Sequence, residues 1–412
     1  MDEVDIAIVG AGAAGLAAAE TVAASGLTGV LLEARDRLGG RAHTIQTAIG
    51  PIDLGCEWLH SADQNPLVAR VEALGLTIDK TPPPWANIAD NPVFSRRERA
   101  AFGEAFQALD ARIEAAARDG GPDRPASDLM DPDSPWNPLL NAFSAFYNGA
   151  EFDQVSLHDY AAYDDTEVNW RVAEGYGTAI ARLAPKALPT RLSCPVTMIR
   201  HDGPRVTLET ALGDVSARAV IVCVPTTILA TGALRFMPAL ADKLDAAAGL
   251  PLGLADKVFL TLDEPEMFPP ETQVYGDPHT TATGAYHLRP LHRPIIEVFL
   301  GGAHARSLEG QGPGAAAAFA IDGLAEVYGG EVRRKVHVLA ETHWAGDPFA
   351  GGSYSHALPG HAGARAVLAA PVDQRLFFAG EACSPNFFST AHGAWQTGQT
   401  AAKAAIGALT GG

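Results

Sequence analysis

The sequence has few of the residues that mark disulfide, zinc or membrane proteins. Its 412 residues include four cysteines, and these are scattered without any Cys-x-x-Cys pair. That spacing argues against a zinc ribbon or a disulfide scaffold, so no metal site is predicted, and reduced thiols in a cytoplasmic protein are the simplest interpretation. No run of about twenty apolar residues is present and no signal-like start is visible, so neither a membrane span nor a secretory signal is predicted.

Positive charge is also scarce. The chain has 30 Lys and Arg residues against 48 Asp and Glu residues, which gives a formal net charge of −18. This excess of negative charge argues against binding to nucleic acid or to an anionic membrane surface. It suits a cationic small molecule, although a general effect on solubility explains it equally well. The hydrophobic content of 47% and the length allow a sizeable core and two or three domains.

The first forty residues carry the strongest pattern in the chain. Residues 4–9 form an apolar, β-branched run that predicts a buried strand, and the glycine-rich segment Gly10–Gly15 follows it at once. An Ala-rich helix is expected over 16–25, and a second strand at Val30–Leu32 delivers an acid, Glu33. Strand, glycine turn, helix, strand and acid in this order are typical of a dinucleotide-binding unit.

The residues of this unit have distinct functions if a dinucleotide binds. Gly10 permits the tight turn, Gly12 lets the backbone approach a pyrophosphate, and Gly15 lets the helix pack closely on the strand. The start of the helix presents N–H groups to the phosphates, and Glu33 can accept hydrogen bonds from a ribose. An Ala- and Gly-rich helix start that merely packs tightly is the alternative.

The next segment indicates which dinucleotide binds. Residues 34–41 are Ala-Arg-Asp-Arg-Leu-Gly-Gly-Arg, and this segment resembles the FAD-binding stretch of the flavin amine oxidases, the monoamine and polyamine oxidase superfamily. The resemblance implies FAD, with charge-assisted hydrogen bonds from Arg41 to a phosphate; a surface arginine is the alternative. It also implies cofactor contacts for Ala14, Ala34, Arg35 and Gly40.

The C-terminal part of the chain resembles the same family. Residues 343–355 are similar to its Trp-x-x-Asp-Pro-x-x-x-Gly-Ser-Tyr segment, which implies a cofactor contact at Trp344. Tyr354 then corresponds to an aromatic wall that holds the amine before the flavin, and packing in a strand is the alternative. Gly380 and Glu381 match a pair whose carboxylate bonds an FAD oxygen.

A second helix start follows at 389–398. The resemblance places Ala391 and Ala394 at the flavin, and it places Thr390 where the family has its second aromatic wall. Ser353 occupies the position of the cysteine that links the flavin covalently in monoamine oxidases. Serine cannot form that link, so noncovalent FAD is expected.

Four central residues complete the predicted site. Residues 53–60 resemble the segment that passes the flavin ring in the polyamine oxidase branch, which implies that Trp58 backs the flavin and His60 reaches the substrate. Lys257 begins an apolar strand and matches the family's lysine that holds a water against flavin N5. Val196 matches the position beside the adenine. Core packing for Trp58, a structural role for His60 and a surface position for Lys257 are the alternatives.

These observations predict an α/β fold with two parts. An FAD-binding Rossmann-type domain, similar to that of glutathione reductase, is expected from residues 1–80, 191–245 and 344–412. A substrate-binding domain with a mixed sheet and helices is expected from residues 81–190 and 246–343. The oligomeric state is not predicted.

The predicted function is oxidation of a primary or secondary, polyamine-like amine. Hydride transfer to flavin N5 gives an imine, which water hydrolyses to an aldehyde or ketone, and O2 is reduced to H2O2. An L-amino-acid oxidase or a flavin desaturase is the alternative within the superfamily, and an amino-acid oxidase would need a cation such as Arg171 or Arg289 for the carboxylate. A third hypothesis is a non-enzymatic, flavin-holding scaffold that serves partner proteins, as the histone demethylase relatives do within chromatin complexes.

Overall fold

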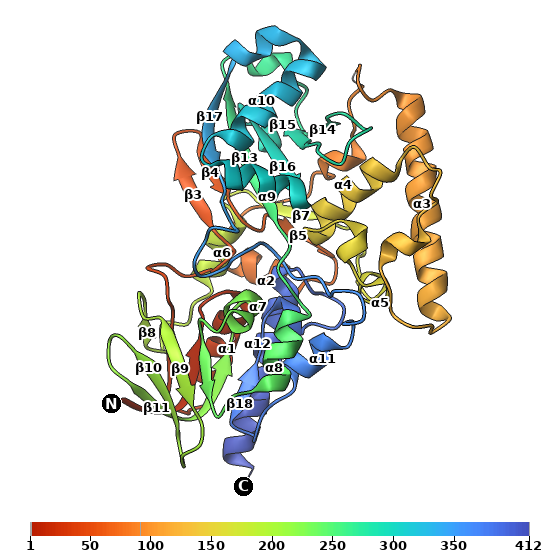
Figure 1. Ribbon diagram of the computed structural model, residues 1–412. Helices are drawn as coiled ribbons and strands as arrows, with labels where there is room; N and C mark the ends of the chain where they lie inside the picture. The colour runs from red at the N-terminus through yellow and green to blue at the C-terminus, as the bar shows by residue number, and fades with distance from the viewer. Residues whose placement is uncertain (1, 91, 412) are drawn as a thin grey trace.

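The computed structural model describes residues 2–90 and 92–411 and contains two large sheets. Figure 1 shows one sheet with helices α1 (Ala13–Ala23) and α12 (Ala391–Thr410) in the lower half, where both termini lie. The second sheet and helix α10 (Ala315–Tyr328) fill the upper half, and helices α3 (Arg96–Arg118) and α4 (Asn137–Asn148) form a lobe at the side.

The lower sheet has eight strands and mixed pairing. Its centre is parallel, because the first strand of the chain lies between two strands that both run in its own direction. An antiparallel pair adjoins this centre. The strands are β12 (Arg235–Met237), β9 (Val196–Arg200), β10 (Val206–Thr210), β11 (Val215–Val222), β1 (Asp2–Val9), β2 (Gly29–Leu32) and β8 (Thr190–Arg191) in spatial order, with β18 (Leu376–Phe378) parallel to β11.

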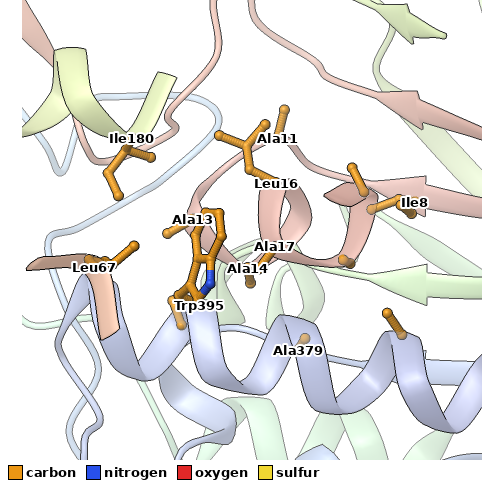
Figure 2. Close-up of a cluster of buried hydrophobic side chains, with 14 of the residues drawn as sticks. Ile8, Ala11, Ala13, Ala14, Leu16, Ala17, Leu67, Ile180, Ala379 and Trp395 are labelled. Atoms are coloured by element: carbon orange, nitrogen blue, oxygen red, sulfur yellow. The ribbon is translucent and has the colours of Figure 1, made fainter. Parts of the chain in front are cut away.

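Helices α1 and α12 cross in direct backbone contact, which small residues allow. A Cβ on Gly398 would lie 2.0 Å from the Ala14 carbonyl oxygen, and a Cβ on Gly15 would lie 1.8 Å from that of Gly10. Neither position therefore tolerates a side chain without movement of the backbone. Figure 2 shows the indole of Trp395 in this core beside Ala13. The start and the end of the chain thus fold as one unit.

The upper sheet has five strands, all of them antiparallel to their neighbours. Its strands in spatial order are β14 (Thr272–Tyr275), β15 (Ala285–Leu288), β16 (Ile295–Gly301), β13 (Ala255–Leu262) and β17 (Val336–Glu341). The α/β fold with a Rossmann-like unit is confirmed. The mixed pairing lies in the eight-stranded sheet, whereas the substrate-side sheet expected to be mixed is antiparallel. Short connections join β14 to β15 and β15 to β16 as hairpins.

The two faces of the five-stranded sheet differ in chemistry. One face carries Val258, Leu260, Ile296 and Val298 and packs against α10 and helix α9 (Gly302–Gln311), which was not predicted. Because side chains alternate along a strand, the residues between them face the other way. That second face carries Lys257 and Glu297, and it looks toward the segment around β5 (Trp58–Leu59).

The remaining elements connect these parts. A capping box at Ser95 begins α3, and the Ser156 side chain caps α5 (Leu157–Ala161). Strands β5 and β6 (Ile78–Asp79) pair with β7 (Trp170–Val172), which ties the N-terminal segment to the side lobe. The other elements are β3 (Thr44–Thr47), β4 (Gly50–Asp53), α2 (Pro66–Ala73), η1 (Pro84–Ala86), η2 (Ala126–Leu129), η3 (Phe152–Gln154), α6 (Tyr176–Arg182), α7 (Thr226–Ala230), α8 (Ala241–Ala248), η4 (Pro265–Met267), η5 (Pro290–His292), η6 (Gly330–Arg334), α11 (Ala364–Ala369) and η7 (Glu381–Cys383).

In the described part of the chain, none of the helices has the length and apolar character needed to cross a membrane. The four cysteines are free thiols. The predicted domain boundaries and the cytoplasmic location stay predictions.

Candidate active site

The start of α1 lies at the carboxyl end of β1, where the predicted dinucleotide unit places it. Gly12 is its N-cap, and among the described residues no side chain caps the first turn. Glu33 follows β2 and is buried; its carboxylate accepts hydrogen bonds from the Ala11 N–H at 2.6 Å and the Arg35 N–H at 2.9 Å. The helix end therefore offers N–H donors to an anion beside a fixed carboxylate.

The second glycine turn packs against the first. Gly12 and Gly39 form a β-bridge, and a Cβ on Gly40 would lie 3.2 Å from the Gly12 Cα. Gly10 and Gly40 both have positive φ angles, of 97° and 60°. Glycine is the residue that adopts this conformation without strain. The two turns predicted to bind the cofactor are thus in contact.

Arg41 and Glu381 come from opposite ends of the chain and meet in an ion pair of 2.9 Å. The Glu381 carboxylate also accepts hydrogen bonds from the Ser355 hydroxyl at 2.6 Å and the Ser389 N–H at 2.9 Å. Burial raises the pKa of Glu381, but the Arg41 charge and these hydrogen bonds outweigh it and bring the pKa below its usual value. Glu381 is therefore a carboxylate at neutral pH.

Arg35 and Trp344 have protein partners of their own. The Arg35 guanidinium forms two hydrogen bonds of 2.7 Å with Asp347, a partner that was not predicted. The Trp344 indole N–H donates to the Leu54 carbonyl at 3.1 Å. Both contacts join the two chain ends. The other predicted cofactor residues lie along the same sheet: Val196 begins β9, Gly380 follows β18, Ala34 follows Glu33, and Ala391 and Ala394 form the first turn of α12.

Lys257 is buried on β13, so the alternative of a surface lysine is wrong. Its ammonium lies 2.6 Å from Glu297 Oε1, 3.0 Å from Glu57 Oε2 and 3.2 Å from the Asp53 carbonyl oxygen. Burial lowers the pKa of Lys257, but Glu297 and Glu57 outweigh it, and the net pKa is raised. The ammonium is therefore charged, and it contacts two carboxyl groups and one carbonyl oxygen.

The strand register explains how Glu297 reaches Lys257. Phe299 is directly opposite Lys257, and Glu297 is opposite Phe259, so Glu297 and Lys257 are diagonal neighbours on one face. His287 is directly opposite Glu297 on the other side. Sequence reasoning missed Glu297 and His287. A single acid in the run Ile-Ile-Glu-Val-Phe-Leu was a usable signal, because a buried acid requires a partner.

His60 has a fixed hydrogen-bond partner. Its Nδ1 lies 2.6 Å from the Asn169 amide oxygen, whose NH2 group donates to the Glu167 carbonyl. Nδ1 therefore carries the proton, and Nε2 keeps its lone pair. Burial lowers the pKa of His60 against the opposing charges of Asp165 and Glu57 and the hydrogen bond to Asn169. The imidazole is neutral at pH 7.

Tyr354 and Thr390 differ in how free their side chains are. The Tyr354 hydroxyl donates a hydrogen bond to the Phe146 carbonyl on α4. Burial raises the pKa of Tyr354, and the positive charge of Lys257 acts in the opposite direction. The Thr390 hydroxyl caps α12 by accepting from the Gly393 N–H at 3.0 Å, and it donates to the Phe387 carbonyl at 2.6 Å. A helix cap accounts for Thr390, and its role as a cavity wall stays a prediction.

Trp58 stands between charged and aromatic groups. The Arg171 guanidinium lies 5.0 Å from its ring, and Trp85 of η1 meets it edge-on at 4.8 Å. Arg171 is 2% exposed and forms ion pairs with Asp79 at 2.6 Å and Glu271 at 2.8 Å. Sequence reasoning gave Trp85 no function, and its partner could not be found because 27 positions separate the two tryptophans.

These residues fit a flavin dinucleotide. The α1 donors, the buried Glu33 carboxylate and the Arg41–Glu381 pair lie at the carboxyl ends of parallel strands, the usual position of a nucleotide in this fold. A cavity there is lined by Arg41, Glu381 and the ends of β11 and β18. A Cβ on Gly380 would meet no heavy atom within 4 Å among the described residues, so the backbone is open to a ligand.

Comparisons with known proteins identify the family. The model of the flavin-containing amine oxidoreductase family matches residues 131–406, and that of an NAD(P)-binding Rossmann-like domain matches residues 8–72. Polyamine oxidase 2 of Arabidopsis thaliana is 28% identical over 97% of this chain and 87% of its own. Lysine-specific histone demethylase 1 homolog 3 of Oryza sativa subsp. japonica is 30% identical over 95% of this chain and 53% of its own.

Solved structures show the same fold. Cyclohexylamine oxidase from Brevibacterium oxydans IH-35A has a TM-score of 0.80 at 22% identity, covering 98% of this chain and 99% of its own. Wild-type putrescine oxidase bound to putrescine has a TM-score of 0.78 at 18% identity, covering 97% and 98%. The family model spans more than half of the sequence. The chain therefore belongs to the flavin-containing amine oxidoreductase family, as its motifs predict.

Proposed function

We propose that this amine oxidoreductase binds FAD noncovalently and oxidises a primary or secondary amine of the polyamine type. The products are an imine, hydrolysed to an aldehyde or ketone, and H2O2 from O2. The observation that carries the proposal is the buried, charged Lys257 beside Glu57. The Lys257 charge lowers the pKa of Tyr354, and the Glu57 charge raises that of His60, each against the effect of burial. The names of the relatives support the polyamine type.

The chain ends would hold the cofactor. The first turn of α1 and Arg41 supply donors for phosphate oxygens, and Glu33 and Glu381 supply acceptors for hydroxyl groups. The Ser353 hydroxyl is engaged in both directions with the Ala255 backbone, at 2.9 Å each. This arrangement supports noncovalent attachment.

The substrate would be oriented by a neutral histidine and an aromatic face. When bound, the flavin accepts a hydride equivalent from the carbon next to the amine nitrogen. His60 Nε2 can accept a hydrogen bond or a proton from the substrate ammonium, because Asn169 keeps the proton on Nδ1. The Tyr354 ring offers an electron-rich face to the same cation. A neutral amine is the form that can release a hydride.

Both guanidinium groups considered for an amino-acid oxidase already have protein partners. Arg171 is paired with Asp79 and Glu271. Arg289 is held by Glu266 at 3.3 Å and by the Phe268 carbonyl at 3.2 Å. These contacts favour an amine over its α-carboxylated analogue.

A peroxide assay on the purified yellow protein tests the proposal. We expect turnover of putrescine, spermidine or spermine to exceed that of a monoamine such as cyclohexylamine, and turnover of lysine or ornithine to be lower still. Release of the flavin by acid precipitation tests noncovalent attachment. A protein that produces no peroxide from any of these amines would remove the proposed function.

A further inference from the structure

The Lys257 ammonium lies among protein oxygen atoms. Three oxygen atoms lie within 3.2 Å of its Nζ, and they come from three separate segments of the chain. Two of these oxygen atoms belong to carboxyl groups, so two acids contact one ammonium.

The two carboxyl groups bound to Lys257 are themselves neighbours. Oxygen atoms of Glu57 and Glu297 lie within 4.8 Å of each other and of a His287 ring nitrogen. Two buried carboxyl groups this close cannot both ionise without strong repulsion, so a proton on one of them relieves it. Other charged or titratable groups facing the pair are Asp53, His60, Arg171, Glu271, His287 and Arg293.

One ammonium balances one carboxylate. Two ionised carboxylates beside Lys257 would leave an uncompensated negative charge in a buried site, which is costly. From this geometry we propose that Glu57 and Glu297 share one proton, that Lys257 is the positioning residue of the pair, and that the pair delivers the proton consumed when O2 is reduced. This inference rests on the proposed oxidase function.

The directions of the pKa shifts agree with this distribution. Burial and the Glu57 charge raise the pKa of Glu297, which makes it the protonated member. Burial also raises the pKa of Glu57, but the Lys257 charge, together with that of Arg171, outweighs this and lowers it. The pair as a unit carries the proton.

The proton count gives the pair a task. Reduction of O2 to H2O2 takes up two electrons and two protons. The C–H bond of the amine supplies both electrons and one proton as a hydride equivalent, and the second proton must come from another group. The pair releases its proton at this step, and the proton that the next substrate ammonium loses restores it, so each turnover closes without a further reactant.

Infrared difference spectroscopy of the flavin-loaded protein tests the shared proton without turnover. We expect the C=O band of a protonated carboxyl group at neutral pH to disappear in Glu297→Gln. The same band should disappear in Glu57→Gln, because Glu297 then becomes the only partner of Lys257 and ionises. Glu341→Gln is the matched control, because Glu341 is opposite Val258 on the other face of the same sheet. Persistence of the band in both pair variants would overturn the proposal.

Stopped-flow kinetics test the delivery step. Glutamine keeps the acceptor for Lys257 and the donor for Glu57 but cannot release a proton, so Glu297→Gln should fold normally. We expect reoxidation by O2 to slow about 100-fold and to lose its dependence on pH, while reduction by the amine changes less than about threefold. Equal slowing of both half-reactions would contradict the proposal. Absence of amine turnover in the wild type would instead remove the proposed function, and the infrared result would still stand.

Discussion

Two buried groups of charged side chains differ in how their charges balance. The cofactor-side cluster, Arg41, Glu381, Arg365 and Asp159, is linked through the Ser355 hydroxyl, which contacts both Glu381 and Arg365. Each acid there has its own guanidinium, and Arg365 binds Asp159 through two contacts of 2.6 and 2.8 Å. In the lysine cluster, Lys257, Glu57 and Glu297, one cation faces two acids.

This difference separates fixed charge from movable charge. Balanced pairs keep their protonation over a wide pH range, which suits a site that must hold a cofactor in one position. An excess acid beside a single cation holds a proton that can leave at moderate cost. The cofactor-side cluster should therefore control flavin retention and stability, and the lysine cluster should control turnover and its pH dependence.

The largest expected effect comes from breaking the cofactor-side cluster. Glu381→Ala leaves Arg41 without its carboxylate, and it leaves the Ser355 hydroxyl and the Ser389 N–H without an acceptor. We expect the free energy of unfolding to fall by about 3–5 kcal/mol and the purified protein to be colourless. Thermal melting and visible absorption measure both. Glu381→Gln keeps the shape of the side chain and one acceptor oxygen. Its stability and flavin content should lie between those of the wild type and Glu381→Ala. A yellow, fully stable Glu381→Ala protein would contradict the distinction between the clusters.

Removing the cation of the lysine cluster should lower turnover and leave the flavin bound, the reverse of the effect expected for Glu381→Ala. Lys257→Met should leave the protein yellow and lower kcat about 100-fold. Its stability should fall less than in Glu381→Ala at neutral pH, because both carboxyl groups can bind a proton. Without the Lys257 charge, burial raises the pKa of both carboxyl groups in this variant. The folded variant then binds more protons than the unfolded chain, so its stability relative to wild type falls as the pH rises. Melting curves at about pH 6 and about pH 9 check this, and Lys257→Arg should restore stability at the higher pH.

The two clusters also show what the sequence could and could not reveal. Arg41 and Glu381 lie in motifs of specific spacing. If both motifs bind the same ligand, the two residues must lie close together in the fold. Lys257 was found in the same way, but its partner Glu297 depends on the register between β13 and β16, which no local pattern specifies. The Arg35–Asp347 pair likewise depends on chain ends 312 positions apart. The Thr390 cap follows from the helix start that was predicted beside it, yet the resemblance alone pointed to a cavity wall.

A smaller effect is expected where a neutral histidine adjoins the lysine cluster. Asn169→Leu removes the acceptor that keeps the proton of His60 on Nδ1. We expect kcat/KM to fall about tenfold with no loss of flavin. Without Asn169, part of the His60 population carries its proton on Nε2, and this tautomer cannot accept a hydrogen bond from the amine. Asn169→Asp adds a carboxylate, which raises the pKa of His60 and moves the acid limb of the kcat/KM profile to higher pH. Superimposable pH profiles for both variants would show that His60 does not receive the amine.

The smallest expected effect is on the pH dependence of stability, and it comes from a histidine outside the lysine cluster. His392 on α12 is buried, and burial together with the nearby His60 lowers its pKa to about 4. Its folded pKa is depressed below the unfolded value of 6.5, so the unfolded state binds more protons between pH 6.5 and pH 4, and stability is lost as the pH falls through that window. His392→Phe should reduce this slope by at most about 1.4 kcal/mol per pH unit. Melting temperatures across the window measure it, with the exposed His337→Gln as control. The alkaline behaviour of the lysine cluster should be unchanged in both variants, and a change there would mean that the two titrations are coupled.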